Sequence, residues 1–435
     1  MARGDQPPEL PVPGIRSLTN RYTPEYGGDP VMSYDFTSYT NRFGKDAYAV
    51  DAVLGRSSGW GFEPRRPKEG FDFIPMWVAD MNFATAPAVT DAIISRVQHP
   101  LFGYYSASDA YYNSIISWHE RRHHFSGLKR EDIGYENGVH GMVTSAIQIL
   151  SSPGDKILLH SPVYVGYASD IEGTGRKSVY SPLLPDENGV WRMDFEDMER
   201  KIKENRIHLV VFCSPHNPTG RVWERWELEK AFEIFERYEC YVISDEIWCD
   251  IILGQKEHIP LLLVNEWAKS HVLAAYAPSK TFNLAGLIGS YHIIPDPFLR
   301  DRLRRYEDNI HYNEMNVLSM HALMGAYSAS GEDWVGALTA VLRGNAEYAV
   351  SYINGHFPGV WTAMPEATYM LFLDCTRNLE QTGRSMDQLL EAGWEVGVGW
   401  QDGRDFEGPC HIRLNLALPR TKLEEAMERL SKYVF

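Results

Sequence analysis

The sequence predicts an α/β fold in which a large domain with a mostly parallel sheet is joined to a smaller α+β domain. Between about residues 70 and 300, short β-branched and apolar runs alternate with longer segments of helical periodicity. That order is typical of parallel strands and their crossover helices. After about residue 315, two long helical segments precede two strands and a terminal helix. We therefore expect an N-terminal arm at 1–30, a large domain at 70–314, and a small domain formed by 31–69 together with 315–435.

The expected strands of the large domain are runs of β-branched, aliphatic and aromatic residues, and the expected helices repeat their apolar residues with helical spacing. The strands are expected at 156–160, 207–214, 241–245 and 271–276, and the helices at 143–150, 193–204 and 224–237. In the last third, helices are expected at 315–327, 334–353 and 422–433, and strands at 369–374 and 411–416. The first 30 residues are rich in Pro and Gly, which predicts an irregular arm.

The composition favours an intracellular enzyme over a nucleic-acid-binding or membrane protein. The 435 residues carry a formal net charge of −16, and a field of that sign repels phosphate backbones. No apolar run approaches the ~20 residues that span a bilayer, and the opening MARGDQPPELPVPG lacks the apolar core of a signal peptide. We therefore expect no nucleic acid, no membrane and a cytoplasmic location. Five cysteines without a CxxC pair predict reduced thiols, with neither a disulfide framework nor a zinc site.

Four polar residues stand out because of their positions relative to the predicted strands. Asn217 in SPHNPTG, Asp245 in SDEIWCD and Lys280 in APSKTFNLAGL each end or follow a different strand. Open parallel sheets bind ligands at the carboxyl ends of their strands, so these three residues are expected along one edge. Arg413, in HIRLNLALPR, lies inside an apolar strand near the C-terminus.

Three of these residues, taken singly, have ordinary structural explanations. Lys280 could be a surface lysine, Asp245 a helix cap, and the NPTG around Asn217 a turn. Arg413 is harder to explain, because an arginine in an apolar strand needs an anionic partner. Together the four fit the needs of pyridoxal phosphate. This cofactor requires a lysine for its Schiff base and a carboxylate that keeps its pyridine nitrogen protonated, and an arginine suits the α-carboxylate of an amino-acid substrate.

On these motifs the chain resembles the fold-type I pyridoxal-phosphate enzymes of the aminotransferase class I and II family. Within that family it is most similar to the MalY/PatB branch of cystathionine β-lyases, or C–S lyases. The resemblance extends over about residues 35–435, and its carriers are MWVADMNF, HPLFGYY, SSPGDKILLHSPVY, SPHNPTGRVW, SDEIWCD, APSKTFNLAGL and RLNLALPR. It implies a large domain with a mostly parallel sheet of the seven-stranded type, an amino-acid substrate, and a homodimer with shared active sites.

The resemblance also implies a role for each motif residue around the cofactor. Lys280 would form the Schiff base and shuttle protons. Asp245 would pair with the pyridinium, and Asn217 would donate to the phenolic oxygen and contact the substrate. Tyr164 would stack on the ring, and Arg413 would hold the substrate carboxylate.

The cofactor's phosphate is expected at the start of a helix and at a subunit boundary. The peptide NH groups of His140, Gly141 and Met142 should open a helix onto the phosphate, and the hydroxyl of Ser279 should add a donor. In relatives the tyrosine of FGY, here Tyr104, reaches the phosphate of the neighbouring subunit. We also expect Tyr104 to act as a catalytic and substrate-binding residue.

Two positions depart from the pattern common among relatives. Many have Tyr or His three residues after the pyridinium Asp, whereas this chain has Trp248. The indole of Trp248, still expected at the cofactor, can donate a hydrogen bond but cannot exchange a proton. Many aminotransferases have a phosphate-binding arginine where this chain has Ile288, as in the C–S lyase branch. That loss favours a lyase over a transaminase.

The segment HERRH at 119–123 matches the HExxH zinc signature. Two arginines within it and the lack of a clear third ligand nearby argue against a zinc ion. We expect instead an amphipathic helix with Tyr111, Ile115 and Trp118 on its buried face, and no metal site.

The first hypothesis for function is a β-eliminating C–S lyase that cleaves L-cystathionine or a related cysteine S-conjugate to thiol, pyruvate and ammonia. An aminotransferase or an amino-acid racemase would use the same residues, and a requirement for a 2-oxo acid would separate an aminotransferase from a lyase. A regulatory ligand-binding protein is the third alternative. The sequence does not identify the group on the sulfur. Candidates for the pocket wall that selects it are Tyr104, Tyr105, Trp248 and Tyr369.

Overall fold

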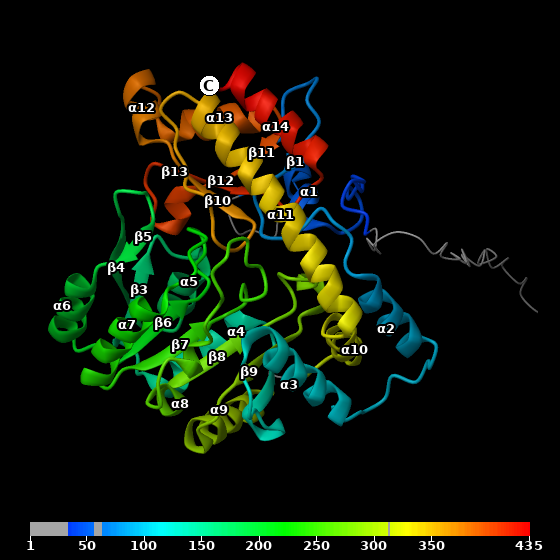
Figure 1. The fold of residues 1–435 in the computed structure, drawn as a ribbon, viewed down its shortest axis with the longest axis vertical. Helices are drawn as coiled ribbons and strands as arrows, with labels where there is room; N and C mark the ends of the chain where they lie inside the picture. Colours follow the sequence, from blue (N-terminus) through cyan, green and yellow to red (C-terminus); the bar gives the residue numbers. More distant parts are fainter. Residues whose placement is uncertain (1–33, 56–62, 312–313) are drawn as a thin grey trace, which may run out of the picture. The chain divides into compact units, whose positions relative to one another are not determined.

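The computed structural model describes residues 34–55, 63–311 and 314–435, so the arm predicted at 1–30 lies outside the described residues. Residues Asp35–Phe435 belong to one structural unit. This unit contains sheets of eight, three and two strands with helices packed around them (Figure 1). The predicted α/β class is confirmed, and the boundary between a large and a small domain stays a prediction.

The largest sheet has the strand order β2-β9-β8-β7-β6-β3-β4-β5. Its strands are β2 (Ile133–Glu136), β3 (Lys156–Ser161), β4 (Lys177–Pro185), β5 (Trp191–Met193), β6 (Leu209–Cys213), β7 (Tyr241–Asp245), β8 (Val272–Tyr276) and β9 (Ser290–Ile293). The five central strands β4, β3, β6, β7 and β8 pair in parallel. β9 is antiparallel to β8 and β2, and the short β5 is an antiparallel edge strand on β4. The sheet is therefore mostly parallel, with the predicted seven strands plus this added edge.

The central strands are apolar because helices cover both faces of the sheet. Strands β6 and β8 are buried along their whole length. The helices of this part are α3 (Asp109–His123), α4 (Val139–Leu150), α5 (Val165–Gly173), α6 (Phe195–Asn205), α7 (Arg225–Arg237), α8 (Ala268–His271) and α9 (Pro297–Ile310). The expected strands and helices occur, with ends shifted by a few residues.

Helix α4 begins at Val139, before the periodic segment expected at 143–150, and its first turn contains the peptide groups expected to open onto the phosphate. The residue before it, Gly138, has a φ of +85°, a conformation that side chains rarely adopt. This glycine turns the chain directly from β2 into the helix, and it places the first turn of α4 at the carboxyl edge of the sheet.

The second sheet, in the order β10-β13-β12, places Arg413 in its centre. It consists of β10 (Met370–Asp374), β12 (Gln401–Asp402) and β13 (His411–Asn415), all antiparallel. Arg413 on β13 lies opposite Phe372 on one side and Gln401 on the other. A parallel pair of two-residue strands, β1 (Ile74–Pro75) and β11 (Val398–Gly399), was not predicted.

Long helices pack beside the second sheet (Figure 1). The remaining helices are α1 (Tyr48–Asp51), α2 (Pro87–Val97), α10 (Val317–Ala326), α11 (Ala329–His356), α12 (Thr376–Thr382), α13 (Met386–Glu395) and α14 (Arg420–Tyr433). Helix α11 begins earlier than expected because the hydroxyl of Ser328 accepts a hydrogen bond from the Gly331 NH and caps it.

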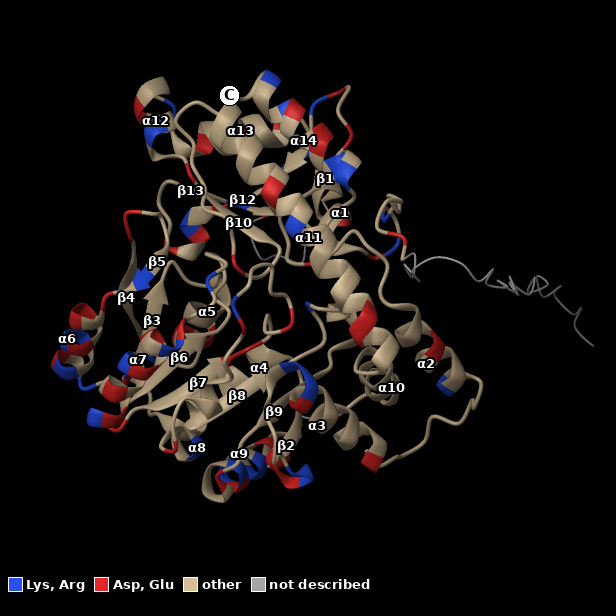
Figure 2. Ribbon diagram, viewed as in Figure 1, with Lys and Arg blue, Asp and Glu red and all other residues tan. Residues whose placement is uncertain are grey.

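Acidic and basic residues occur together on the outer helices, as the red and blue segments of α6 and α9 show in Figure 2. On α9, Asp301 is exposed next to exposed arginines, whereas Glu307 is buried. Among the described helices, none combines the length and apolarity needed to cross a bilayer.

Candidate active site

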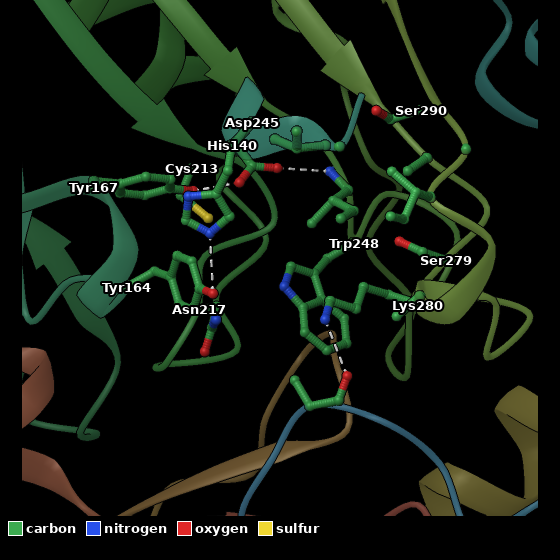
Figure 3. A pocket seen from close by; sticks show the side chains of 18 residues that line it. His140, Tyr164, Tyr167, Cys213, Asn217, Asp245, Trp248, Ser279, Lys280 and Ser290 are labelled. Atoms are coloured by element: carbon green, nitrogen blue, oxygen red, sulfur yellow. Dashed lines mark hydrogen bonds between the residues drawn. The ribbon is translucent and has the colours of Figure 1, made fainter. Parts of the chain in front are cut away.

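A cavity of about 200 Å³ lies at the carboxyl ends of β6, β7 and β8. The structure brings most of the predicted cofactor residues to its wall, and their side chains face a common space (Figure 3). The predicted residues that line it are His140, Tyr164, Asn217, Asp245, Trp248, Ser279 and Lys280. The convergence expected from strand ends is thus present.

Lys280 lies in the turn after β8 and extends its amine into the cavity (Figure 3). Its Nζ donates a hydrogen bond to the carbonyl of Ala79 at 3.0 Å and lies 5.9 Å from the centre of the Trp248 ring. Burial of the amine lowers the pKa of Lys280, although the nearby Tyr164 and carboxylates oppose this. A larger share of neutral amine follows, and the neutral amine is the nucleophile and base.

Asp245, the last residue of β7, is a buried carboxylate whose hydrogen-bond donors are neutral groups. Its Oδ1 accepts a hydrogen bond from the Ile247 NH at 3.0 Å, and its Oδ2 accepts one from the Tyr167 hydroxyl. Among the described residues, no Lys, Arg or His forms an ion pair with it. Burial raises the pKa of Asp245 despite both hydrogen bonds. A buried carboxylate of this kind suits a ligand that brings a cationic group.

Tyr167, on α5, lines the cavity as well, and the sequence reasoning missed it. Its hydroxyl holds Asp245, and its ring meets that of Tyr164 edge-on at 5.4 Å between centroids. The only available signal was its position three residues after Tyr164, one helical turn along the chain.

Tyr164 and His140 form a polar wall of the cavity (Figure 3). His140 Nε2 lies 3.1 Å from the Tyr164 hydroxyl, and His140 Nδ1 lies 2.7 Å from Asp170 Oδ2. Burial alone would lower the pKa of His140, but Asp170 and Tyr164 outweigh it and raise that pKa. Burial alone would raise the pKa of Tyr164, but the charges of His140 and Lys280 outweigh it and lower that pKa.

The close approach of His140 requires a glycine at position 166, which the sequence reasoning also missed. A Cβ on Gly166 would lie 1.9 Å from the His140 ring. The imidazole of His140 therefore contributes to the site in addition to its peptide NH.

The first turn of α4 points free NH groups at the cavity. In an α-helix the first NH groups have no partner within the helix, and here they belong to Val139, His140 and Gly141. The prediction for Met142 is wrong, because its NH donates to the Gly138 carbonyl at 3.2 Å and its side chain is buried in the core. The predicted set of NH groups is shifted by one residue along a helix that begins at Val139.

Ser279 and Ser290 supply hydroxyls on the opposite side of the cavity (Figure 3). Ser279 was predicted. Ser290 was not, because it comes from the antiparallel strand β9, and its hydroxyl donates to the Glu136 carbonyl at 2.9 Å. Ile288, at the place of the expected arginine, also lines the cavity.

Arg413 is buried, and no carboxylate among the described residues forms an ion pair with it. Its Nη1 donates to Asn217 Oδ1 at 3.1 Å, and its Nη2 donates to Gln401 Oε1 at 2.5 Å and to the Trp77 carbonyl at 3.2 Å. Its Nε is buried without a hydrogen-bond partner, and burial lowers the pKa of Arg413 to about 10. An uncompensated buried guanidinium is a site for an anion.

Arg413 lies on the wall of a second cavity of about 600 Å³, which shares Ala79, Tyr164 and Lys280 with the first. An anion on Arg413 would therefore lie next to the amine of Lys280. Because Asn217 Oδ1 accepts from Arg413, the amide NH₂ of Asn217 is left to donate toward the first cavity.

Tyr104 and Trp248 differ in their position relative to the two cavities. Trp248 lines the first cavity and packs edge-on against Tyr369 at 4.7 Å between ring centroids. Tyr104 is fully exposed and lines neither cavity of its own chain. Its role in a neighbouring subunit stays a prediction.

The HERRH segment forms the end of α3, with Tyr111, Ile115 and Trp118 buried as predicted. His119 Nε2 lies 2.9 Å from the Tyr291 hydroxyl, and His123 Nε2 lies 3.1 Å from Asp250 Oδ1. His123, Cys249 and Asp250 are close enough to hold a metal ion, but Arg122 and Trp118 also donate to Asp250. These contacts explain the cluster as a hydrogen-bonded core, and the absence of a metal stays a prediction.

The parallel sheet with a lysine, a buried carboxylate and a helix N-terminus around one cavity defines a pyridoxal-phosphate enzyme of fold type I. Residues 72–430 match the family described as aminotransferase class I and II, and the chain belongs to this family.

Similar proteins are known by sequence and by structure. Cystathionine beta-lyase PatB of Bacillus subtilis (strain 168) is 32% identical over 363 residues, which cover 82% of this chain and 92% of that protein. Protein MalY of Escherichia coli (strain K12) is also 32% identical, over 82% of this chain and 91% of its own. A PLP-bound putative aminotransferase from Clostridium difficile 630 aligns with a TM-score of 0.84 and 33% identity, over 93% of this chain and 100% of its own. The PLP-bound C-S lyase from Staphylococcus hominis aligns with a TM-score of 0.83 and 28% identity, over 94% and 100%.

Proposed function

We propose that this protein is a pyridoxal-phosphate-dependent C–S β-lyase that cleaves L-cystathionine or a related cysteine S-conjugate. With one water, the products are a thiol, pyruvate and ammonia. The observation that carries the proposal is the meeting of Lys280, Asp245 and Arg413 around two adjoining cavities. The names of the relatives support it, since PatB is a cystathionine β-lyase and the Staphylococcus hominis protein is a C–S lyase.

The residues present fit the cofactor. Asp245 offers a buried negative charge without a cation, which suits a protonated pyridine nitrogen. The first turn of α4, with Ser279, offers donors for a phosphate. When bound, the cofactor supplies an electron sink for the electron pair left at the substrate Cα.

The protein's own groups bind the substrate and move its proton. Arg413 binds the α-carboxylate through its unpaired face, which fixes the substrate beside Lys280. The lowered pKa of Lys280 lets its neutral amine take the proton from Cα. Tyr164 and Trp248 border the same space and reduce the access of water.

We also propose a cytoplasmic homodimer in which Tyr104 reaches the cofactor cavity of the neighbouring subunit as a catalytic and substrate-binding residue. The full exposure of this aromatic side chain supports such a contact. All five cysteines are free thiols, which supports a reducing compartment.

An aminotransferase is the second candidate, because the Clostridium difficile neighbour is titled a putative aminotransferase. The test is to incubate the purified, cofactor-loaded protein with L-cystathionine and to measure pyruvate and thiol without any oxo acid. Equal, continuous release of both supports the lyase. If pyruvate is absent and a new amino acid forms only when a 2-oxo acid is added, the protein is an aminotransferase. Change of optical rotation alone would indicate a racemase, and binding without turnover a ligand sensor.

A further inference from the structure

The second cavity contains an ion pair that the proposed mechanism does not use. Arg42 and Asp80 both line this cavity, together with Arg413 and Lys280. If Arg413 holds the α-carboxylate of a substrate, the remainder of that substrate extends into the same space. The pair is therefore positioned to contact the substituent on the sulfur.

Arg42 and Asp80 face each other in a two-point geometry. Arg42 Nη2 lies 2.6 Å from Asp80 Oδ2, and Arg42 Nη1 lies 3.1 Å from Asp80 Oδ1. The side chains are 18% and 22% exposed, so each keeps a surface toward the cavity. Asp80 directly follows Ala79, whose carbonyl accepts from the Lys280 amine, so the pair lies one residue beyond the reacting centre.

The pair has hydrogen-bonding capacity left for a ligand. A carboxylate offers about four acceptor sites and a guanidinium five N–H donors. Within the described chain, each oxygen of the Asp80 carboxylate accepts one bond from Arg42. Arg42 Nη1 also donates to the Met81 carbonyl at 3.3 Å and to Asn82 Oδ1 at 3.5 Å, so the donors left for a ligand are on Nη2 and Nε. Because the pair is neutral as a whole, it favours neither a lone anion nor a lone cation. It presents opposite charges side by side, which is complementary to an ammonium and a carboxylate on one carbon.

We propose that the Arg42–Asp80 pair binds a zwitterionic amino-acid group at the far end of the substrate, the carboxylate on Arg42 and the ammonium on Asp80. The preferred substrates are then thioethers that join two amino acids. The inference rests on the proposed function for the identity of the thioether, but the binding itself does not require cleavage.

A purely structural role makes a different prediction. Arg42 also ties the segment before α1 to the loop that contains Asp80, Met81 and Asn82. If that were its only role, loss of the pair would weaken the binding of all substrates alike. These roles are separated by the ratio of the affinities for two ligands, one with and one without the distal amino-acid group. The affinity for one ligand alone does not separate them.

The test compares two uncleavable ligands by isothermal titration calorimetry on the cofactor-loaded protein. 2,7-Diaminosuberate is L-cystathionine with CH₂ in place of sulfur, and 2-aminooctanoate has the same chain length without the distal ammonium and carboxylate. The native protein should bind 2,7-diaminosuberate about tenfold more tightly. Arg42→Gln and Asp80→Asn should each bring the two affinities to within about threefold, with the affinity for 2-aminooctanoate unchanged.

Arg65→Gln is the matched control, because it breaks an exposed arginine–carboxylate pair with Glu391 and lines neither cavity. It should keep the native preference. The proposal is overturned if the native protein shows no preference, if either pair variant keeps it, or if both affinities fall together. Failure of the lyase would appear separately, as a retained preference without pyruvate from L-cystathionine.

Discussion

Two buried aspartates of one segment, Asp245 and Asp250, differ in how their charge is balanced. Within the described residues, Asp245 accepts from a tyrosine hydroxyl and a peptide NH, and burial raises the pKa of this carboxyl. Asp250 accepts from Arg122 and His123. Burial alone would raise the pKa of Asp250, but those two partners hold it well below its usual range. Asp250, whose charge is balanced by other residues of the chain, belongs to the core. Asp245, whose charge is not balanced in this way, marks the place of a ligand.

The same contrast applies to the cations. Arg122 has Asp250 as its partner, whereas Arg413 and Lys280 have no carboxylate in the described structure within ion-pair distance. A buried charge without a partner lowers stability, so its presence calls for a function. The three unbalanced groups surround the adjoining cavities, and the HERRH segment, which has a metal-site pattern, lies in the balanced region.

The largest expected effect is on Lys280. Lys280→Ala should lower the rate of pyruvate release from L-cystathionine by about 10³-fold or more, because it removes both nucleophile and base. The unfolding free energy of the cofactor-free protein, measured in urea, should stay within about 1 kcal/mol of the native value, since the amine has no ion-pair partner to lose. A variant that kept a tenth of the native rate would contradict the assigned role.

Asp245→Asn should separate activity from stability. The amide keeps the shape but cannot balance a protonated pyridine nitrogen, so pyruvate release should fall by about 10²–10⁴-fold. The cofactor-free variant should be as stable as the native protein or more so, because a costly buried charge is gone. Marked destabilisation in urea would mean that Asp245 serves the core.

Asp250→Ala should lower the stability of the cofactor-free protein, which Asp245→Asn should not do. Loss of this carboxylate leaves Arg122 and His123 without their partner, and we expect the unfolding free energy to fall by about 3–5 kcal/mol. Urea unfolding of the cofactor-free protein measures this directly. An unchanged midpoint and slope would show that the balanced cluster contributes nothing to the core.

The smallest effect concerns pH, where the two aspartates should act with opposite sign. The folded-state pKa of Asp250 is lowered, so its contribution to stability is present above the unfolded value of about 3.9 and is lost as pH falls further. The folded-state pKa of Asp245 is raised, so its ionisation destabilises the protein at neutral pH, and this cost disappears as pH falls through that pKa. Urea unfolding between pH 7 and 4 should therefore show the cofactor-free Asp245→Asn variant losing its advantage over the native protein. A constant difference would contradict the raised pKa.

The sequence predicts the parts of the site that depend on strand ends. Asn217, Asp245 and Lys280 could be placed together because parallel strands share one edge, and Arg413 because charge in an apolar strand is costly. Tyr167 and Gly166 could not, since their importance depends on how helix α5 is oriented over the cavity. Met142 was misplaced by one residue, because the glycine before α4 indicates where the helix begins but not which of its first NH groups stay unpaired.

Two features of the site could not be placed by reading the sequence as a series of strands and helices. Tyr104 is fully exposed on its own chain, and its predicted place at a neighbouring subunit's cavity depends on an interface that strand and helix patterns do not encode. The specificity of the thioether depends on Arg42 and Asp80, which are far from Lys280 in sequence and adjoin it only in the fold.

The most direct test of the cofactor site is to find the lysine that holds pyridoxal phosphate. Borohydride reduction of the cofactor-loaded protein fixes a lysine-bound cofactor covalently, and peptide mass spectrometry then locates it. The added phosphopyridoxyl mass should appear on the peptide that contains Lys280 and should be absent from the Lys280→Ala variant. Label on another lysine, or a native protein that takes up no cofactor, would contradict the assignment of the cavity.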